Sequence, residues 1–213
     1  MTQAQPVRMS ASPDDSEELA RAEVYGLLAA LIAGPPTAEV YGQLQVAATE
    51  APAAGAFLET SFGELVAASR RLSLQAVQAE HDALFIGVGK PEVLPYGSYF
   101  IAGALNQQPL VALRDELRRI GLERDAALAL TEDHLACLCE VMRFLIAGDE
   151  AGGANLAAQQ RFFSAHLRGW TDALWDTLAA HPRADFYRAV AAFGRDFFAV
   201  EGQAFDMLDA ASS

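Results

Sequence analysis

Apolar residues recur at helical spacing along nearly the whole chain. In the first such segment Val24, Leu27, Leu28, Leu31 and Ile32 follow the i, i+3, i+4, i+7, i+8 pattern of a helix with one buried face. No segment alternates apolar and polar residues with an enrichment of β-branched types, so no sheet is expected. The pattern predicts an all-α fold, a single-domain bundle of roughly eight or more helices.

Residues that start and stop helices divide this pattern into segments. Thr37 and Ser73 are placed to cap the second and fourth helices, because a hydroxyl can accept a backbone N–H of the first turn. Glycines and prolines crowd residues 86–97 and predict a loop there. From about Asn155 the apolar spacing continues to Pro182, which predicts one long helix.

The stretch from Thr131 to Met142 reads as the start of another helix. Thr131 suits the N-cap, and Glu132 and Asp133 suit the positive end of the helix dipole. Adjacent helical residues point about 100° apart, and the leucines that follow occupy the core side. Asp133 is therefore expected to be free to accept hydrogen bonds from a guanidinium, with His134 beside it able to bond an acidic neighbour. A solvated first turn without a binding role is the alternative interpretation.

The composition indicates a globular chain that would attract a basic partner. Of 213 residues 52% are hydrophobic and 20% charged, and the net charge is −13. Such a charge repels nucleic acid and anionic membranes and steers cations toward the protein. No run approaches the ~20 apolar residues of a membrane span, and residues 1–13 lack the apolar core of a signal peptide. We expect a cytoplasmic protein without stable membrane insertion, with a disordered N-terminus (1–13) and one helical domain (14–213).

Motifs of metal and nucleotide chemistry are sparse. None of the four histidines follows a glutamate by three residues, and neither H-E-x-x-H nor C-x-x-C occurs, so no metal site and no cofactor are expected. Cys137 and Cys139 are two residues apart on a predicted helix and point to different sides, so they cannot readily bridge, which suits a reducing compartment. Residues 87–91 look like a phosphate loop, but Pro91 stands where Ser or Thr is needed. A metal- or nucleotide-dependent helical enzyme is the alternative from another functional class.

A binding site is the simpler expectation. Leu84 and Phe85 end a helix at the Gly- and Pro-rich loop, where side chains can stay partly open. Pro95, Tyr96 and Tyr99 would add a rigid, amphipathic wall. The acidic start of the Thr131 segment would add a negatively charged end. Such a site suits a peptide that has arginines at one end and an apolar stretch after them, as a twin-arginine export signal has. Plain core packing is the alternative interpretation for the aromatic and leucine side chains.

Five short motifs occur in a fixed order along the chain. They are Leu84-Phe85-Ile86-Gly87, Pro95-Tyr96-Gly97-Ser98-Tyr99, Glu132-Asp133-His134-Leu135, the Phe163-x-x-His166-Leu167-x-x-Trp170 pattern and Phe186-Tyr187. This order resembles the TorD/DmsD family of cytoplasmic chaperones for molybdenum-cofactor oxidoreductases, to which NarJ-type proteins are related. The resemblance extends from about Glu23 to about Phe198, nearly the whole predicted domain.

The resemblance implies a helical bundle of the TorD-like chaperone type, without enzymatic activity. It implies that the protein binds the twin-arginine leader, the apo form of a molybdopterin oxidoreductase subunit, or both, before cofactor insertion and export. The expected peptide-binding residues are Leu84, Phe85, Pro95, Tyr96, Ser98, Tyr99, Glu132, Asp133 and His134. A NarJ-like chaperone for a client that stays in the cytoplasm is the alternative. The sequence leaves the client open, and also the choice between a monomer and a domain-swapped dimer.

Overall fold

The computed structural model describes residues 13–47, 56–125, 127, 129–147 and 156–212, and these form helices joined by loops. In chain order the elements are α1 (Pro13–Ala33), α2 (Ala38–Val46), α3 (Ala56–Arg71), α4 (Leu74–His81), the π-helical turn η1 (Asp82–Ile86), α5 (Gly97–Ala102), α6 (Gln108–Arg119), α7 (Leu135–Ala147), α8 (Leu156–His166), α9 (Thr171–Ala180) and α10 (Phe186–Ser212). Strand pairing in these residues amounts to an isolated bridge between Tyr96 and His134. The predicted all-α fold is confirmed.

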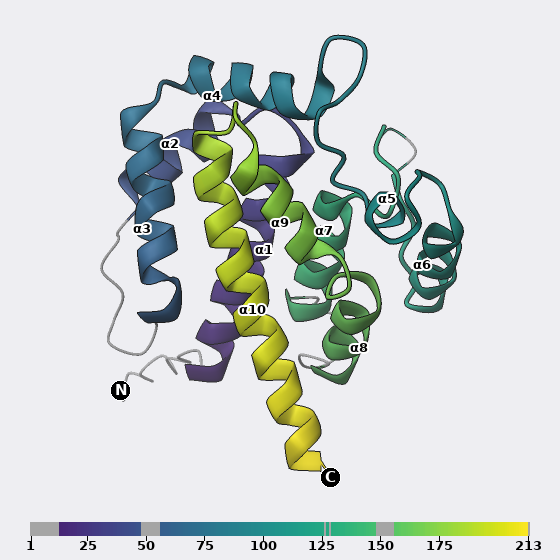
Figure 1. Cartoon of the computed structure of the whole chain (residues 1–213). Helices are drawn as coiled ribbons and strands as arrows, with labels where there is room; N and C mark the ends of the chain where they lie inside the picture. Colours follow the sequence, from purple (N-terminus) through teal and green to yellow (C-terminus); the bar gives the residue numbers. More distant parts are fainter. Residues whose placement is uncertain (1–12, 48–55, 126, 128, 148–155, 213) are drawn as a thin grey trace, which may run out of the picture.

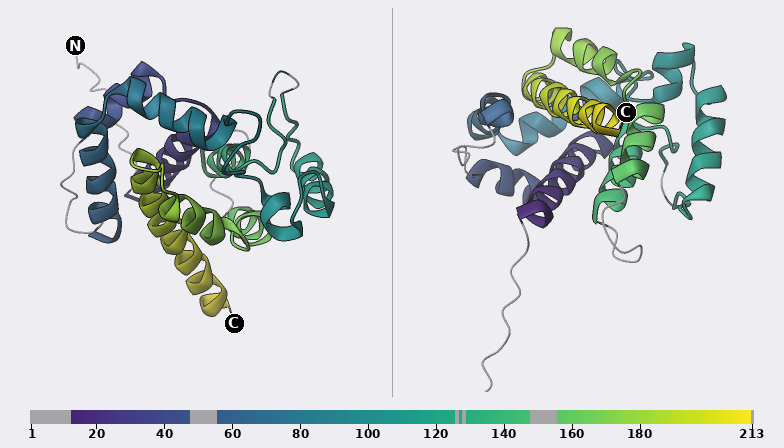
Figure 2. Two further views of the ribbon diagram at one scale, coloured as in Figure 1. Left: turned by 45° about the horizontal axis from the view of Figure 1, so that its top comes forward. Right: turned by 90° about the horizontal axis from the view of Figure 1, so that it is seen from below.

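Two long helices organise the bundle. α10 packs against α3 and α9, and α1 packs against α7 (Figure 1). α5 and α6 lie at one edge of the molecule, and the views of Figure 2 keep them there. Among the described helices, none is long and apolar enough to span a bilayer. The predicted disordered segment 1–13 falls outside the described residues except for Pro13, where α1 begins.

Two helix starts agree with the local sequence. The hydroxyl of Thr37 accepts a hydrogen bond from the Val40 N–H at 3.2 Å, and Ser73 does the same for the Ala76 N–H at 3.2 Å. Each bond satisfies an amide that the first helical turn leaves without a backbone partner. Both predicted caps are confirmed.

The single long helix predicted from residue 155 to Pro182 is wrong. α8 ends at His166 and α9 begins at Thr171. In the gap the Trp170 indole N–H donates to the His166 carbonyl at 2.7 Å, which replaces the backbone N–H of a continued helix. The Trp170 ring then stacks on Phe100 of α5, with ring centroids 5.6 Å apart. The break therefore ties α5 to the main bundle.

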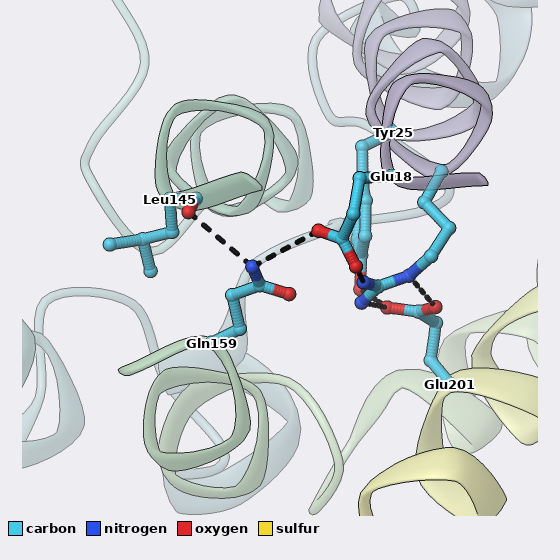
Figure 3. A network of polar contacts seen from close by, with 6 residues as sticks. Glu18, Tyr25, Leu145, Gln159 and Glu201 are labelled. Carbon is cyan, nitrogen blue, oxygen red and sulfur yellow. Dashed lines mark hydrogen bonds and ion pairs between the residues drawn. The ribbon is translucent and has the colours of Figure 1, made fainter. Parts of the chain in front are cut away.

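A buried polar network locks the long helices together. The Glu201 carboxylate of α10 accepts hydrogen bonds from Arg21 Nε (2.7 Å), Arg21 Nη2 (2.8 Å) and the Tyr25 hydroxyl (2.9 Å), both from α1. Glu18 of α1 also accepts a hydrogen bond from Arg21, at 2.6 Å. Gln159 of α8 donates to Glu18 and to the Leu145 carbonyl of α7, each at 3.4 Å, and so extends the network to α7 and α8 (Figure 3). The Glu201 side chain is 3% exposed. A buried charge of this kind is tolerated because it is paired and hydrogen-bonded.

Candidate functional site

Two of the motifs singled out in the sequence lie side by side. The Leu135 N–H donates to the Pro95 carbonyl at 2.8 Å, and the Gly97 N–H donates to the Asp133 carbonyl at 2.9 Å. Between these two bonds the Tyr96 and His134 rings meet edge to face, with centroids 4.7 Å apart. The loop before α5 and the turn before α7 therefore form one unit.

The expected helix start at Thr131 is wrong. α7 begins at Leu135, and the preceding residues form a turn in which the His134 N–H donates to the Thr131 carbonyl at 3.0 Å. His134 acts at the helix start instead, since its Nδ1 accepts the Ala136 N–H at 3.2 Å. Thr131 has the right side chain for a cap, but hydrogen bonding to residues 95–97 holds the turn out of helical conformation.

Asp133 is not the free acceptor that its sequence position suggests. The residue is 3% exposed. Its Oδ1 accepts the Thr131 hydroxyl at 2.6 Å, and its Oδ2 accepts the Ser98 N–H at 2.9 Å. The expectation assumed helical geometry, in which adjacent side chains diverge by about 100°. In the observed turn the carboxylate instead caps the first turn of α5 from across the chain.

His134 is buried as well, at 3% exposed. Burial lowers the pKa of the imidazole to about 4; the Asp133 charge opposes this shift, and a charged His81 would add to it. His134 is therefore neutral at pH 7, which leaves Nδ1 able to accept a hydrogen bond. Asp133 and His134 serve the local fold rather than an open surface.

The Leu84–Phe85 pair is only partly open. Leu84 is fully buried, and its carbonyl accepts the Glu92 and Val93 N–H groups, each at 2.9 Å. The expectation that its side chain stays accessible is wrong, because η1 turns it into the core. Phe85 is partly buried, and its ring packs against Tyr187 of α10 at a centroid distance of 5.1 Å.

The other predicted residues differ widely in exposure. Pro95 and Ser98 are buried, Tyr96 and Glu132 are partly buried, and Tyr99 is 40% exposed. The described surface of the predicted site is thus small. It consists of Tyr99 with parts of Phe85, Tyr96 and Glu132.

A groove that the sequence analysis missed lies next to Glu132. It encloses about 330 Å³ between α1, α7 and the connection from α6 to α7. Its apolar lining consists of Ala29, Ala30, Ala33, Leu117, Leu122, Leu130, Ala136, Cys137, Val141 and Phe144. Phe144 is 48% exposed, which is high for a phenylalanine and indicates an apolar surface that no other part of the described chain covers. We call this site the α1–α7 groove.

Charged residues surround the α1–α7 groove. Four acids line it, Glu123, Asp125, Glu132 and Glu140, against the single arginine of its lining, Arg124. A polar pocket of about 430 Å³ adjoins it, since both share the Glu132 and Arg124 side chains. The adjoining pocket adds Arg114 and Arg118, whereas the groove itself has an apolar floor with an acidic rim, which is complementary to an apolar segment that carries cations.

Glu132 holds the junction between the two pockets. Its Oε2 accepts Arg114 Nη2 at 2.9 Å, and its Oε1 lies 3.7 Å from Arg124 Nε. Burial alone would raise the pKa of this carboxyl, but the hydrogen bond from Arg114, a further one from its own backbone N–H and the two arginine charges hold the pKa below its ordinary value. Glu132 is therefore ionised at neutral pH.

The structure provides little for redox or nucleophilic chemistry. In the described ranges no three His, Cys, Asp or Glu residues are placed to share a metal ion. Both cysteines are free, and burial raises the pKa of the Cys137 thiol to about 11 and that of Cys139 further. Neither thiol is a thiolate at neutral pH, so neither is an activated nucleophile.

A family model described as "Nitrate reductase delta subunit" matches residues 48–176, which is more than half of the sequence. No curated protein matches the chain. The matched region includes α3 to α8 and most of α9, and with them Glu132 and the α7 side of the groove. The general class of the sequence resemblance is confirmed, and a place in the TorD/DmsD branch itself stays a prediction. The chain belongs to the nitrate reductase delta subunit family, whose members are non-catalytic chaperones for the assembly of molybdenum enzymes.

Proposed function

We propose that this protein acts in the cytoplasm and holds the apo form of a molybdenum-cofactor oxidoreductase subunit until the cofactor is inserted. It does so by binding one segment of the client in the α1–α7 groove. The family supplies the general role of assembly chaperone. The observation that carries the binding site is an apolar groove of about 330 Å³ with four acids on its lining.

The groove chemistry defines the client segment. An apolar stretch of the client covers the alanine and leucine floor, and the half-exposed Phe144 ring packs against it. Basic residues at one end of the stretch face the acidic rim. The net charge of −13 steers such a segment toward the protein, so association slows as salt screens the charges.

Two kinds of client present such a segment. One is an exported oxidoreductase with a twin-arginine leader, and the other is a client that stays in the cytoplasm. The match to the nitrate reductase delta subunits supports the second, NarJ-like kind. In either case Glu132 contacts the client, while Pro95, Ser98, Asp133 and His134 position the turn that carries Glu132. Tyr99, Tyr96 and Phe85 extend the contact beyond the groove.

The test is a titration of the purified protein with amino-terminal peptides of the molybdenum-enzyme subunits of the same organism. The Phe144→Ser variant removes an exposed apolar side chain from the groove and should weaken binding about tenfold or more, on the order of a buried side chain's transfer energy. Val111, 49% exposed on α6, lies outside the groove lining and gives the matched Val111→Ser control. Equal affinities of the two variants would place the peptide elsewhere.

A further inference from the structure

The rim of the α1–α7 groove holds a carboxylate that two arginines of the chain already approach. Arg114 reaches Glu132 from α6, and Arg124 reaches it from the connection to α7. The Glu132 side chain is 13% exposed, whereas those of Arg114 and Arg124 are 43% and 30% exposed. The carboxylate is thus buried more deeply than either cation that neutralises it.

The two carboxylate oxygens are held unequally. Arg114 Nη2 makes a hydrogen bond to Oε2 at 2.9 Å. Arg124 Nε lies 3.7 Å from Oε1, which is longer than a hydrogen bond. A guanidinium and a carboxylate can form two parallel bonds, so the Arg124 contact uses little of what Oε1 can accept.

Arg124 also lines the α1–α7 groove, and Ala30 and Phe144 line it as well. A client that fills the groove must therefore approach the same space as the Arg124 side chain. Arg124 has other partners nearby: its Nη1 donates to the Asp125 carbonyl at 3.2 Å, and Glu123 precedes it on the groove lining. These acceptors can keep the guanidinium partnered when it leaves Glu132.

We infer that Arg124 is an internal stand-in for a client guanidinium, holding the Oε1 side of Glu132 in the empty groove until an arginine of the client replaces it. This inference rests on the proposed function and specifies how the same groove selects its client. The exchange keeps Glu132 paired in both states, so binding never leaves a buried carboxylate without a cation. A client with an apolar stretch but no arginine leaves Arg124 on Glu132 and gains only the apolar contacts of the groove floor.

The exchange is tested with two synthetic probes, a fifteen-residue peptide of two arginines followed by an apolar helical stretch, and the same peptide with both arginines replaced by glutamine. In the Arg124→Gln variant the arginine peptide should bind about three- to fivefold more tightly, the range expected for the loss of one partly exposed competing ion pair. Affinity for the glutamine peptide should change less than twofold on the same scale. The Glu132→Gln variant should lose about tenfold of the preference for the arginine peptide, and the other acids of the rim should keep the rest.

Arg195→Gln is the matched control, because Arg195 also pairs with an acid, Asp176, and does so at a site outside the groove lining. A rise in arginine-peptide affinity of equal size in Arg124→Gln and Arg195→Gln would reduce the effect to net charge and overturn the inference. So would a fall in affinity for Arg124→Gln.

Failure of the inference and failure of the proposed function are separable. If Phe144→Ser weakens binding but Arg124→Gln leaves it unchanged, the exchange is refuted and the groove remains the client site. Binding of both peptides that Phe144→Ser leaves unchanged, or no binding of either peptide to the wild-type protein, removes the groove as the client site and the exchange with it.

Discussion

Two of the arginine–glutamate contacts in the described part of the chain, at Glu201 and at Glu132, are built differently. In the first, Arg21 grips Glu201 with two hydrogen bonds of 2.7 and 2.8 Å, and a tyrosine hydroxyl adds a third (Figure 3). In the second, Glu132 receives one bond of 2.9 Å from Arg114 and a looser contact of 3.7 Å from Arg124. The first pair lies between long helices, and the second lies at the edge of a groove.

The difference favours the proposed exchange of partners at Glu132 and disfavours one at Glu201. The Glu201 carboxylate accepts three hydrogen bonds and is sealed from water, so opening it would leave a buried charge unpaired. The Glu132 carboxylate has spare acceptor capacity next to an open groove, so a third guanidinium can reach it. At Glu201 the pair holds two helices together, whereas at Glu132 we propose that it recognises the client; burial and the number of hydrogen bonds distinguish the two.

The largest expected effect is on the sealed pair. Glu201→Gln leaves the partly buried Arg21 with Glu18 as its remaining carboxylate and should lower the free energy of unfolding by up to about 3–5 kcal/mol, measured by urea denaturation. The double variant Arg21→Met with Glu201→Leu removes both charges and should recover much of the loss. A double variant no more stable than Glu201→Gln would mean that packing, not the unpaired charge, dominates here.

The turn that carries Glu132 should become less stable in acid. His134 has a folded pKa of about 4 against an ordinary 6.5, so the unfolded chain binds this proton more readily. Its contribution is fully present above pH 6.5 and is lost as the pH falls toward 4, on the order of 3 kcal/mol. His134→Asn keeps a cap acceptor for the Ala136 N–H and removes the titration. As the pH falls from 6.5 toward 4, the variant should become more stable relative to the wild-type protein in thermal melts. Equal pH dependence of the two melting temperatures would contradict the lowered pKa of His134.

Asp133 belongs to the same turn. Asp133→Asn keeps one acceptor oxygen and turns an NH2 group toward either the Ser98 N–H or the Thr131 hydroxyl, so it should cost about 1–3 kcal/mol of stability. Peptide affinity, measured by calorimetry well below the melting temperature, should change little. A large loss of affinity with unchanged stability would instead return Asp133 to direct contact with the client.

Glu132 should show the reverse balance. Glu132→Gln should weaken binding of an arginine-bearing peptide about tenfold, because a charge-assisted hydrogen bond is lost. Stability should fall by less than about 1 kcal/mol, since Arg114 and Arg124 both reach solvent. Peptide titrations and thermal melts of the same preparation measure both quantities, and a loss of stability without a loss of affinity would make Glu132 a second structural lock.

The smallest effect should come from an exposed pair. Arg195 and Asp176 form an ion pair with both side chains largely in solvent. Arg195→Gln should change the free energy of unfolding by less than about 0.5 kcal/mol. A larger effect would show that the exposure of an ion pair does not predict its contribution to stability.

The sequence alone determined the helical class and several helix boundaries. Thr37 and Ser73 act as predicted because a cap involves atoms three residues apart, which the local sequence fully specifies. Thr131 also has a hydroxyl side chain but does not cap the helix, because residues 95–97 form hydrogen bonds with the turn that follows it. No local pattern contains that competition. The same limit explains the break at Trp170, whose ring finds its stacking partner in α5.

The order of the motifs along the chain was enough to indicate a molybdenum-enzyme chaperone, since a family is recorded in the sequence itself. The order of the motifs did not indicate which of their side chains are buried. Asp133 reads as an exposed acid but lies under α5, and Glu132, one residue earlier, reaches the groove. The groove joins Ala30 of α1 to Phe144 of α7, more than a hundred positions apart. Helical periodicity reports which side of a helix is apolar, and only the packing of whole helices decides which part of that side is left uncovered.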